Sequence, residues 1–250
     1  MTTRTDQIAP GVHLVADGLV NFYLLEDGGE VALVDAGWPR SWPTIEAAVR
    51  ELGRAPGDLK SVVLTHAHPD HLGAAAKVRE ETGATVFVAR EEVARARGKA
   101  KGASPFALVP GLLPHLWRPS ATGFVLHATA HGFMTPTWVD EVTPFDIGDE
   151  LDVPGRPRVV ATPGHTEGHV SLLLSGGVLI AGDALTNLDV LTRETGPRLM
   201  PDALNGDPER TRASLANLEG LDADTILPGH GGPILLSPSE AVARVRATSP

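Results

Sequence analysis

The sequence predicts a mixed α/β protein in which loops carry the chemistry, and three observations support this fold class. Short segments with the residue pattern of β-strands alternate with segments of helical periodicity. The chain has 27 glycines and 21 prolines among 250 residues, which suits many short elements joined by tight turns better than a helical bundle. Histidines and aspartates directly follow several predicted strands. The length allows one large domain or two small ones.

The chain begins with a predicted β-meander. Alternating apolar residues mark three strands, at residues 12–15, 22–25 and 31–34. Asp27-Gly28-Gly29 supplies the turn before the third strand. Apolar residues then recur at helical spacing from Ile45 to Leu52, and Gly53 ends the pattern.

Two pairs of a strand and a helix follow the meander. A valine-rich strand at residues 61–64 leads into the polar loop 65–71, and an alanine-rich helix then closes near Gly83. The next strand is expected at residues 85–89 and a short charged helix at 91–97.

Residues 98–145 break this regular pattern and are predicted to be an apolar insertion that forms a lid. The segment holds six prolines and two of the four tryptophans, and its apolar content distinguishes it from a linker. Six of its residues are candidates for covering a substrate pocket: Phe106, Leu112, Leu113, Trp117, Phe133 and Trp138. A satellite core or a contact between two copies in a homodimer would explain them equally well. We assign no role to its three histidines, His115, His127 and His131.

Regular elements resume after the insertion. Strands are expected at residues 158–161, 170–174, 178–181 and 225–227, the second and third forming a hairpin. Asp207-Pro208 has the pattern of a helix start, and Ser237-Pro238-Ser239-Glu240 has capping-box spacing before a final helix.

Composition excludes several classes of function. The chain has no cysteine, which rules out disulfides, thiolate metal ligands and a cysteine nucleophile. It has 21 Lys+Arg against 31 Asp+Glu, a net charge of −10, so nucleic acid is not an expected partner. No signal-type segment opens the sequence and no run of 18 apolar residues occurs, so we expect a cytoplasmic protein with no membrane association.

Seven histidines and aspartates at four places after strands form the candidate functional site. They are His66, His68, Asp70, His71, His165, Asp183 and His230. At the His and Asp frequencies of this chain, the pattern H-x-H-x-D-H would arise by chance in about one chain in a thousand. Imidazole and carboxylate are ligands that zinc and iron accept when thiolate is unavailable. Seven such groups exceed the needs of one metal and suit two metals that share a carboxylate.

These motifs, in this order, resemble the metallo-β-lactamase superfamily. The resemblance covers H-x-H-x-D-H, the later Pro-Gly-His, Gly-Asp and Pro-Gly-His sites, and the early segment Leu33-Val34-Asp35-Ala36-Gly37. It implies a single domain over residues 1–250, an αββα four-layer sandwich with two mixed β-sheets between helices and the metal site on loops at one edge. It also implies two zinc ions per chain, with iron or manganese as alternatives.

The resemblance assigns roles to individual residues. It implies that His66, His68 and His165 hold the first metal, that Asp70, His71 and His230 hold the second, and that Asp183 bridges the two. Asp35 resembles an aspartate that supports the metal site from behind, and we expect His169 to support the ligands without binding metal.

The expected chemistry is hydrolysis of a small-molecule ester, thioester or lactone. A hydroxide between two metals is nucleophilic at neutral pH, and Asp70 would act as the catalytic group that orients it and passes a proton. A serine-hydrolase motif G-x-S-x-G is absent from the sequence.

Departures from known relatives narrow the substrate. The commonest dizinc β-lactamases have cysteine where Asp183 stands, so β-lactams are not expected as the main substrate. Only 20 residues follow His230, which is short for the glutathione-gripping part of glyoxalase II, and Thr186 stands where related lactonases have tyrosine. The acidic charge disfavours a phosphodiesterase or nuclease related to RNase Z.

An oxygenase is the main alternative. Persulfide dioxygenases of this superfamily use one iron on ligands that match His66, His165 and Asp183. The additional ligands of this chain do not distinguish the two reactions. A binding protein without catalysis is a third alternative.

Overall fold

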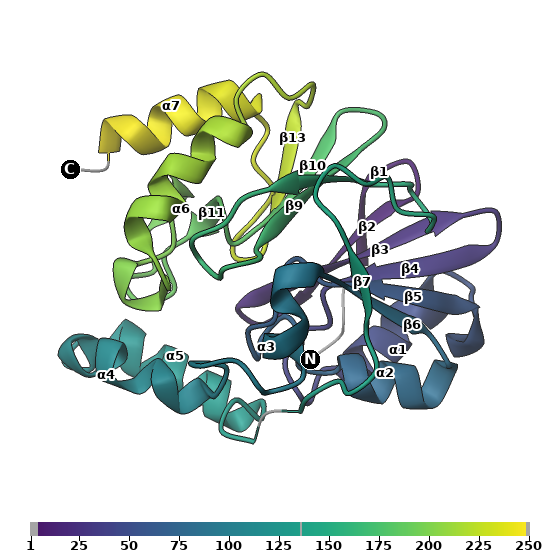
Figure 1. Ribbon diagram of the computed structural model, residues 1–250, viewed down its shortest axis with the longest axis horizontal. Coiled ribbons are helices and arrows are strands. Elements are labelled where there is room, and N and C mark those ends of the chain that lie inside the picture. Colours follow the sequence, from purple (N-terminus) through teal and green to yellow (C-terminus); the bar gives the residue numbers. More distant parts are fainter. Residues whose placement is uncertain (1–4, 136, 249–250) are drawn as a thin grey trace.

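The computed structural model describes residues 5–135 and 137–248, and its elements form four layers. Two β-sheets lie face to face, with helices on the outer side of each (Figure 1). The predicted α/β class and the two mixed sheets of the αββα sandwich are confirmed. No helix in the described part of the chain is long and apolar enough to cross a bilayer.

The larger sheet contains seven strands in sequence order. They are β1 (Thr5–Ala9), β2 (Val12–Asp17), β3 (Val20–Asp27), β4 (Glu30–Val34), β5 (Leu59–Val63), β6 (Thr85–Ala89) and β7 (Thr143–Phe145). The first four pair antiparallel, of which β2 to β4 are the predicted meander and β1 is an added strand, and β4 to β7 pair in parallel. The parallel strands need crossover connections, which α1 (Trp42–Glu51) and α2 (Ala75–Thr82) provide.

The second sheet has the strand order β13-β10-β9-β8. Its strands are β8 (Arg158–Ala161), β9 (Val170–Leu174), β10 (Val178–Gly182) and β13 (Thr225–Pro228). A separate two-stranded sheet joins β11 (Thr186–Leu188) to β12 (Thr195–Arg198). The outer helices are α6 (Pro208–Ser214), which Asp207 caps, and α7 (Pro238–Thr248), whose first turn forms the predicted capping box with Ser237.

Strand periodicity divides the core into layers. In β3 and β4, Leu24 and Leu33 pack in one cluster with α1 and α2, whereas Tyr23 and Val34 face the second sheet. On β10, Ile180 joins the cluster between the sheets, and the neighbouring residues pack with α7 and with Leu215 and Leu218, which follow α6. Both sheets are therefore buried on two faces, as a four-layer sandwich requires.

Residues 98–135 and 137–142, which we call the cover, are largely helical rather than irregular. They contain α4 (Val109–Leu112), α5 (Pro119–Ala130) and two short 3-10 helices, η3 (Pro105–Ala107) and η4 (Leu113–His115). The cover follows α3 (Val93–Ala96) and lies below α6 in Figure 1. The end of the predicted insertion is different, because residues 143–145 form β7 inside the larger sheet.

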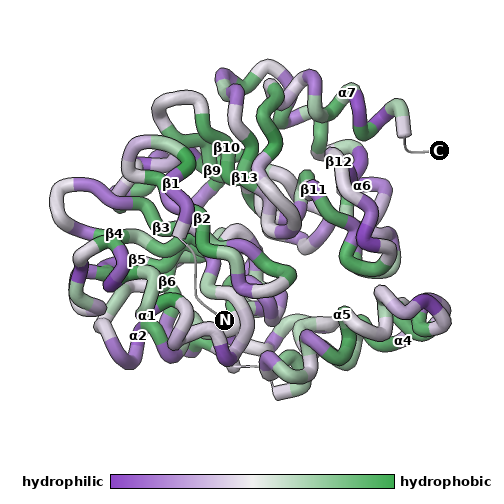
Figure 2. The backbone as a smooth tube through the Cα atoms, turned by 180° about the vertical axis from the view of Figure 1, so that it is seen from behind, coloured by the Kyte–Doolittle hydropathy of each residue, from purple (hydrophilic) through white to green (hydrophobic). Residues whose placement is uncertain are grey.

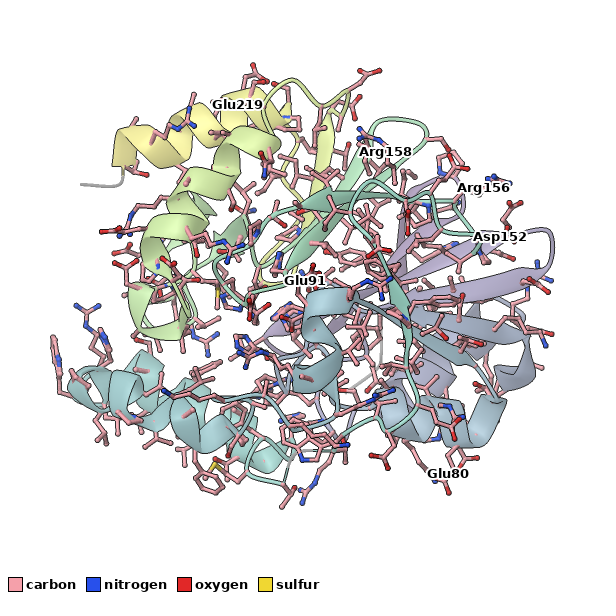
Figure 3. All side chains as sticks on the ribbon, viewed as in Figure 1. Glu80, Glu91, Asp152, Arg156, Arg158 and Glu219 are labelled. Carbon is pink, nitrogen blue, oxygen red and sulfur yellow. The ribbon has the colours of Figure 1, made fainter. Side chains whose placement is uncertain are left out.

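The cover has its own hydrophobic cluster. Phe124, Ala128 and Phe133 pack with Trp38 of the sandwich and with Leu191. Apolar residues recur along α4 and α5 in the hydropathy view of Figure 2. The labelled charged residues of the sandwich, such as Glu80, Asp152 and Glu219, lie at the outside of the molecule (Figure 3).

Candidate metal centre

The structure brings all seven predicted ligands together at one edge of the sandwich. The loop after β5 carries His66, His68, Asp70 and His71, the loop after β8 carries His165, and β10 and β13 lead directly into Asp183 and His230. Because β10 and β13 are parallel neighbours, their carboxyl ends meet at the same edge. Three groups of ligand atoms each lie within 4.8 Å of one another: His66, His68 and His165; His66, His71 and Asp183; and Asp70, His71 and His230.

Asp183 is the centre of this cluster. Its Oδ2 atom is 3.3 Å from Nε2 of His165 and 3.3 Å from Nε2 of His230. The same oxygen is 3.6 Å from Nε2 of His71. One carboxylate thus contacts histidines of both predicted ligand sets.

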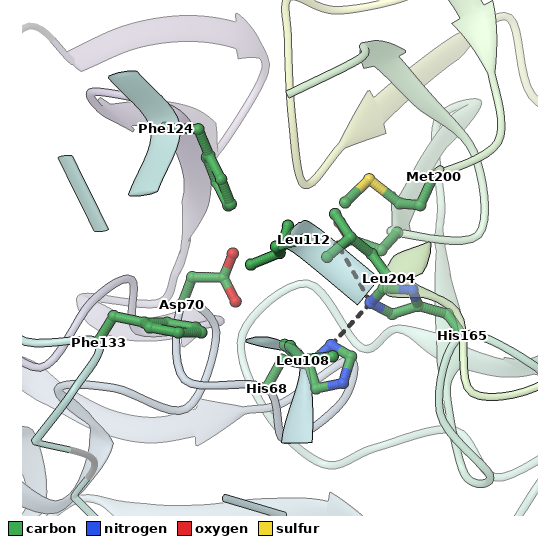
Figure 4. Close-up of a pocket in the computed structure, with 10 residues that line it drawn as sticks. His68, Asp70, Leu108, Leu112, Phe124, Phe133, His165, Met200 and Leu204 are labelled. Atoms are coloured by element: carbon green, nitrogen blue, oxygen red, sulfur yellow. Dashed lines mark hydrogen bonds and ion pairs between the residues drawn. The ribbon is translucent and has the colours of Figure 1, made fainter. Parts of the chain in front are cut away.

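Hydrogen bonds orient the histidine rings toward the centre. In four of them Nδ1 is engaged outside the cluster, by Thr65 for His66, Asp35 for His71, Asn205 for His165 and the Leu19 carbonyl for His230. Each of these contacts leaves Nε2 facing the cluster, as metal-binding histidines require. His68 presents Nδ1 instead, 2.8 Å from Nε2 of His165 (Figure 4).

The donor set fits metal ions. Four atoms are fully buried and have no hydrogen-bond partner among the described residues: Nε2 of His66, His71 and His230, and Oδ1 of Asp183. Buried polar atoms without partners are costly, and bound metal ions would supply the missing partners. A set of imidazoles and carboxylates without thiolate suits zinc, iron or manganese.

Burial and neighbouring charges together set the charge state of the cluster. Burial lowers the pKa of His66, His68 and His165, which leaves these imidazoles neutral and able to bind metal. Burial alone would raise the pKa of Asp183, but His230 and His71 outweigh it and hold this pKa well below its usual value. Asp183 is therefore a carboxylate.

Asp35 lies behind the ligands. Its Oδ1 accepts from the backbone N–H of Thr65 at 2.8 Å, and its Oδ2 accepts from the Thr65 hydroxyl and from Nδ1 of His71. It has a positive φ of 59° at the end of β4, a conformation that aspartate tolerates better than most residues. One buried carboxylate thus fixes the start of the loop and one ligand ring.

His169 supports Asp183 through the backbone. Its Nε2 accepts from the Asp183 N–H at 3.0 Å, so its Nδ1 carries the proton and bonds the Thr162 hydroxyl at 2.9 Å. Burial lowers the pKa of His169 to about 3, which keeps the ring neutral in this tautomer. His169 contributes no atom to the ligand groups found in the described chain.

Glu92 is a supporting residue that the sequence analysis did not identify. Its buried carboxylate accepts from the N–H of Ala67 at 2.9 Å and from the N–H of Gly168 at 3.0 Å. It therefore joins the loop of His66 and His68 to the loop after His165. No signal in the sequence distinguishes it from the exposed charges of the same short helix. Asn205 was also missed, because it is distant in sequence from His165.

The loop of His230 is fixed by the start of the chain. The Pro228 carbonyl accepts from Nδ2 of Asn21 at 2.9 Å and from the Tyr23 hydroxyl at 2.6 Å. The N–H of Asn21 also donates to the Gly229 carbonyl at 2.8 Å. Residues about 200 positions apart therefore define the last ligand.

Close packing explains why glycine precedes two ligands. A Cβ atom at Gly229 would lie 2.2 Å from Oδ1 of Asp183. Gly164 has a φ of 131°, and a Cβ there would lie 2.2 Å from the backbone nitrogen of Thr211 on α6. In each Pro-Gly-His motif, the histidine is the ligand and the glycine is required because no side chain fits at its position.

A cavity opens above the cluster, and its walls correct the predicted pocket. Six apolar residues line it together with His68, Asp70, His165 and Asp183: Leu108, Leu112, Phe124, Phe133, Met200 and Leu204 (Figure 4). Of the predicted pocket residues, Phe133 and Leu112 belong to this lining. Phe106, Leu113 and Trp117 have exposed side chains, and Trp138 packs beside Gly98. Neither Phe106, Trp117 nor Trp138 lines the cavity, because the cover turns these side chains elsewhere.

The unassigned histidines are not part of the cluster. The rings of His127 and His131 stack 3.9 Å apart by their centroids beside Trp38. His115, in η4, is likewise outside the ligand groups of the described residues.

Comparisons with known proteins agree with this site. The sequence model of the metallo-beta-lactamase superfamily matches residues 15–230. The chain is 31% identical to a probable metallo-hydrolase, YflN, of Bacillus subtilis (strain 168), over 91% of this chain and 86% of that protein. It is 29% identical to a hydroxyacylglutathione hydrolase of Acidiphilium cryptum (strain JF-5), over 86% of this chain and 65% of that one. A crystal structure of a metallo-beta-lactamase family protein from Thermus thermophilus superposes with a TM-score of 0.69 at 31% identity, covering 96% of this chain and 80% of that one.

The chain therefore belongs to the metallo-beta-lactamase superfamily. Within it, the chain is a metallo-hydrolase, with a cluster of histidines and aspartates compatible with divalent metal.

Proposed function

We propose that this protein is a dinuclear metal hydrolase that cleaves an ester, thioester or lactone carbonyl, with zinc as the expected metal. One set of ligands would be His66, His68 and His165, the other Asp70, His71 and His230, with Asp183 shared. The observation that carries the proposal is the position of Asp183, whose Oδ2 lies 3.3 to 3.6 Å from histidines of both sets. When bound, divalent metals lower the pKa of water and polarise a carbonyl oxygen.

Asp70 is the candidate catalytic residue. It lines the cavity, and its Oδ2 is 3.5 Å from Nε2 of His230. A carboxylate there can orient the attacking water, accept its proton and deliver that proton to the leaving group. Asp183 is fully buried and fixed by His169, so its proposed role is to hold the centre together.

One relative supports a carbonyl substrate. Hydroxyacylglutathione hydrolase, as its name states, hydrolyses hydroxyacylglutathione, and the identity of 29% leaves thioesters as one candidate among esters and lactones. The small-molecule substrate would enter through the cavity beneath the cover.

Metal analysis combined with a substrate panel tests the proposal. The chain would be reconstituted separately with zinc, manganese and iron, and each form assayed on an ester, a thioester and a lactone. We expect two metal ions per chain by elemental analysis and hydrolysis that His68→Ala abolishes. One iron per chain together with oxygen consumption on a persulfide would overturn the hydrolase and establish the oxygenase. Hydrolysis by a protein with a single metal would overturn the dinuclear centre.

A further inference from the structure

The walls of the cavity differ sharply from its floor. The floor consists of His68, Asp70, His165 and Asp183, whereas all six wall residues are apolar. Five of the six wall side chains are at most 7% exposed and belong to one hydrophobic cluster, and Leu108 packs against it. The volume of the cavity between them is about 20 Å³, room for about one water molecule, so the walls leave space for a short substrate group only.

The wall is built from two segments that are packed against each other. Leu108, Leu112 and Phe124 come from the cover, and Met200 and Leu204 from the segment after β12. At Gly111 the two segments approach so closely that a Cβ would lie 2.7 Å from the Ala203 carbonyl oxygen.

Hydrogen bonds also anchor the cover to the rest of the chain. Nη1 of Arg40 donates to the Ala130 carbonyl at 2.8 Å, and the Ser120 hydroxyl donates to the Leu191 carbonyl. The wall is thus preformed, which favours binding of a group of defined shape.

The walls of the cavity offer no cation to a negatively charged substrate group. Among the described residues, the lining contains no lysine or arginine. Arg95, whose charge acts on His68, is engaged elsewhere, since it donates to the Gly102 carbonyl and lies 3.7 Å from Glu92. A carboxylate among the apolar walls would lose its hydration without compensation.

We infer that the wall binds the acyl side of the substrate and selects a short, apolar and uncharged acyl group. This inference rests on the proposed hydrolytic function and deepens it. The inference predicts that the protein prefers an uncharged substrate to esters, thioesters or lactones whose acyl group carries a carboxylate. The selection comes from the wall residues and is independent of which metals occupy the floor.

A matched pair of esters tests the charge selection. The mono-4-nitrophenyl ester of fumaric acid carries a carboxylate at the end of its acyl chain, which the trans double bond keeps from attacking the ester, and its methyl ester has the same backbone without the charge. We expect kcat/KM for the neutral ester to exceed that for the anion by about tenfold or more, because a mismatched group in a pocket commonly costs that much. Equal kcat/KM values would overturn the inference and leave hydrolysis intact. No hydrolysis of either ester, or of any thioester or lactone, would overturn the proposed function itself.

A charge introduced into the wall provides the second test. Leu108 is half-buried at the cavity, so Leu108→Lys can place an ammonium group there while its stem stays packed. We expect this variant to shift the ratio of kcat/KM toward the anionic ester by about tenfold. The matched control is Leu113→Lys, because Leu113 is in the same segment, is 59% exposed and does not line the cavity. An equal shift in both variants, or none in Leu108→Lys while Tm is retained, would contradict the assignment of the wall.

Discussion

The floor and the cover of the cavity are organised in opposite ways. On the floor, polar atoms of the ligands are fixed by named partners such as Asp35, His169 and Glu92. The cover is held mainly by apolar packing and also exposes large apolar side chains, including Trp117 at 76% and Leu126 at 66%. Directional bonds define the geometry that chemistry needs, whereas apolar packing defines only shape and polarity. Chemistry and selectivity should therefore respond to different substitutions.

The largest expected effect is on the floor. Replacing the central carboxylate by Asp183→Asn removes a charge that faces three histidines, and we expect kcat/KM to fall by about 10³-fold with loss of bound metal. Elemental analysis and steady-state kinetics measure both. Asp202→Asn is the acidic control, because Asp202 is an exposed partner of Arg212. If Asp183→Asn kept its metal and its activity, the proposed role of Asp183 in the metal centre would be wrong.

A smaller effect, on metal affinity, is expected for Glu92, which holds two loops of the metal centre but is not a ligand. Glu92→Gln places an amide NH₂ against one of two backbone N–H donors, so one loop contact is lost. We expect metal affinity to fall by about 10- to 100-fold, as is typical for partners of ligand residues. Competition with a chelator measures the affinity, and the exposed neighbour substitution Glu91→Gln should leave it unchanged. If Glu91→Gln weakened metal binding equally, the effect would come from the loss of negative charge in general and not from the contacts of Glu92 with the two loops.

On the cover, adjacent residues should differ in stability. Leu112 is 5% exposed in the cover's cluster, and Leu112→Ala should cost about 2–5 kcal/mol of unfolding free energy. Leu113 is 59% exposed, and Leu113→Ala should change it by no more than about 0.5 kcal/mol. Denaturant unfolding of the metal-loaded protein measures both. Similar values would show that the cover is not packed as a core.

The smallest expected effect, a change in Tm, concerns an ion pair between two residues that flank the cover. Arg90, before the cover, makes two hydrogen bonds to Asp146, after it, and this pairing lowers the pKa of Asp146. The pair therefore adds stability above the unfolded pKa of aspartate, and this contribution is lost as pH falls through the lowered folded pKa. Asp146→Asn should slightly lower Tm at neutral pH and make no difference in strong acid. A Tm difference that persists in strong acid would exclude this linkage.

The sequence predicted the floor much better than the cover. The ligands occur in short motifs after strands, so local pattern and strand order suffice to place them. Helix α5 was not predicted because it is apolar on several sides, with Phe124 buried and Leu126 exposed, and so lacks a single apolar stripe. Strands β7, β11 and β12 were missed because they have three or four residues and two of them carry proline, and β1 was missed because its residues are largely polar and none of them is buried. Glu92 required the tertiary structure, since its two partners lie 25 and 76 residues away.

The contacts of Pro228 and Gly229 with Asn21 and Tyr23 bear on the order in which the protein folds. During synthesis, the larger sheet and the His66 to His71 loop emerge long before β13 does. The last ligand reaches its place only when the end of the chain docks on its beginning, and such non-local closure is slow. The ligand set that contains His230 should therefore be completed late in refolding. Metal binding by that set would mark a late step, whereas the set of His66, His68 and His165 does not have to wait for this closure.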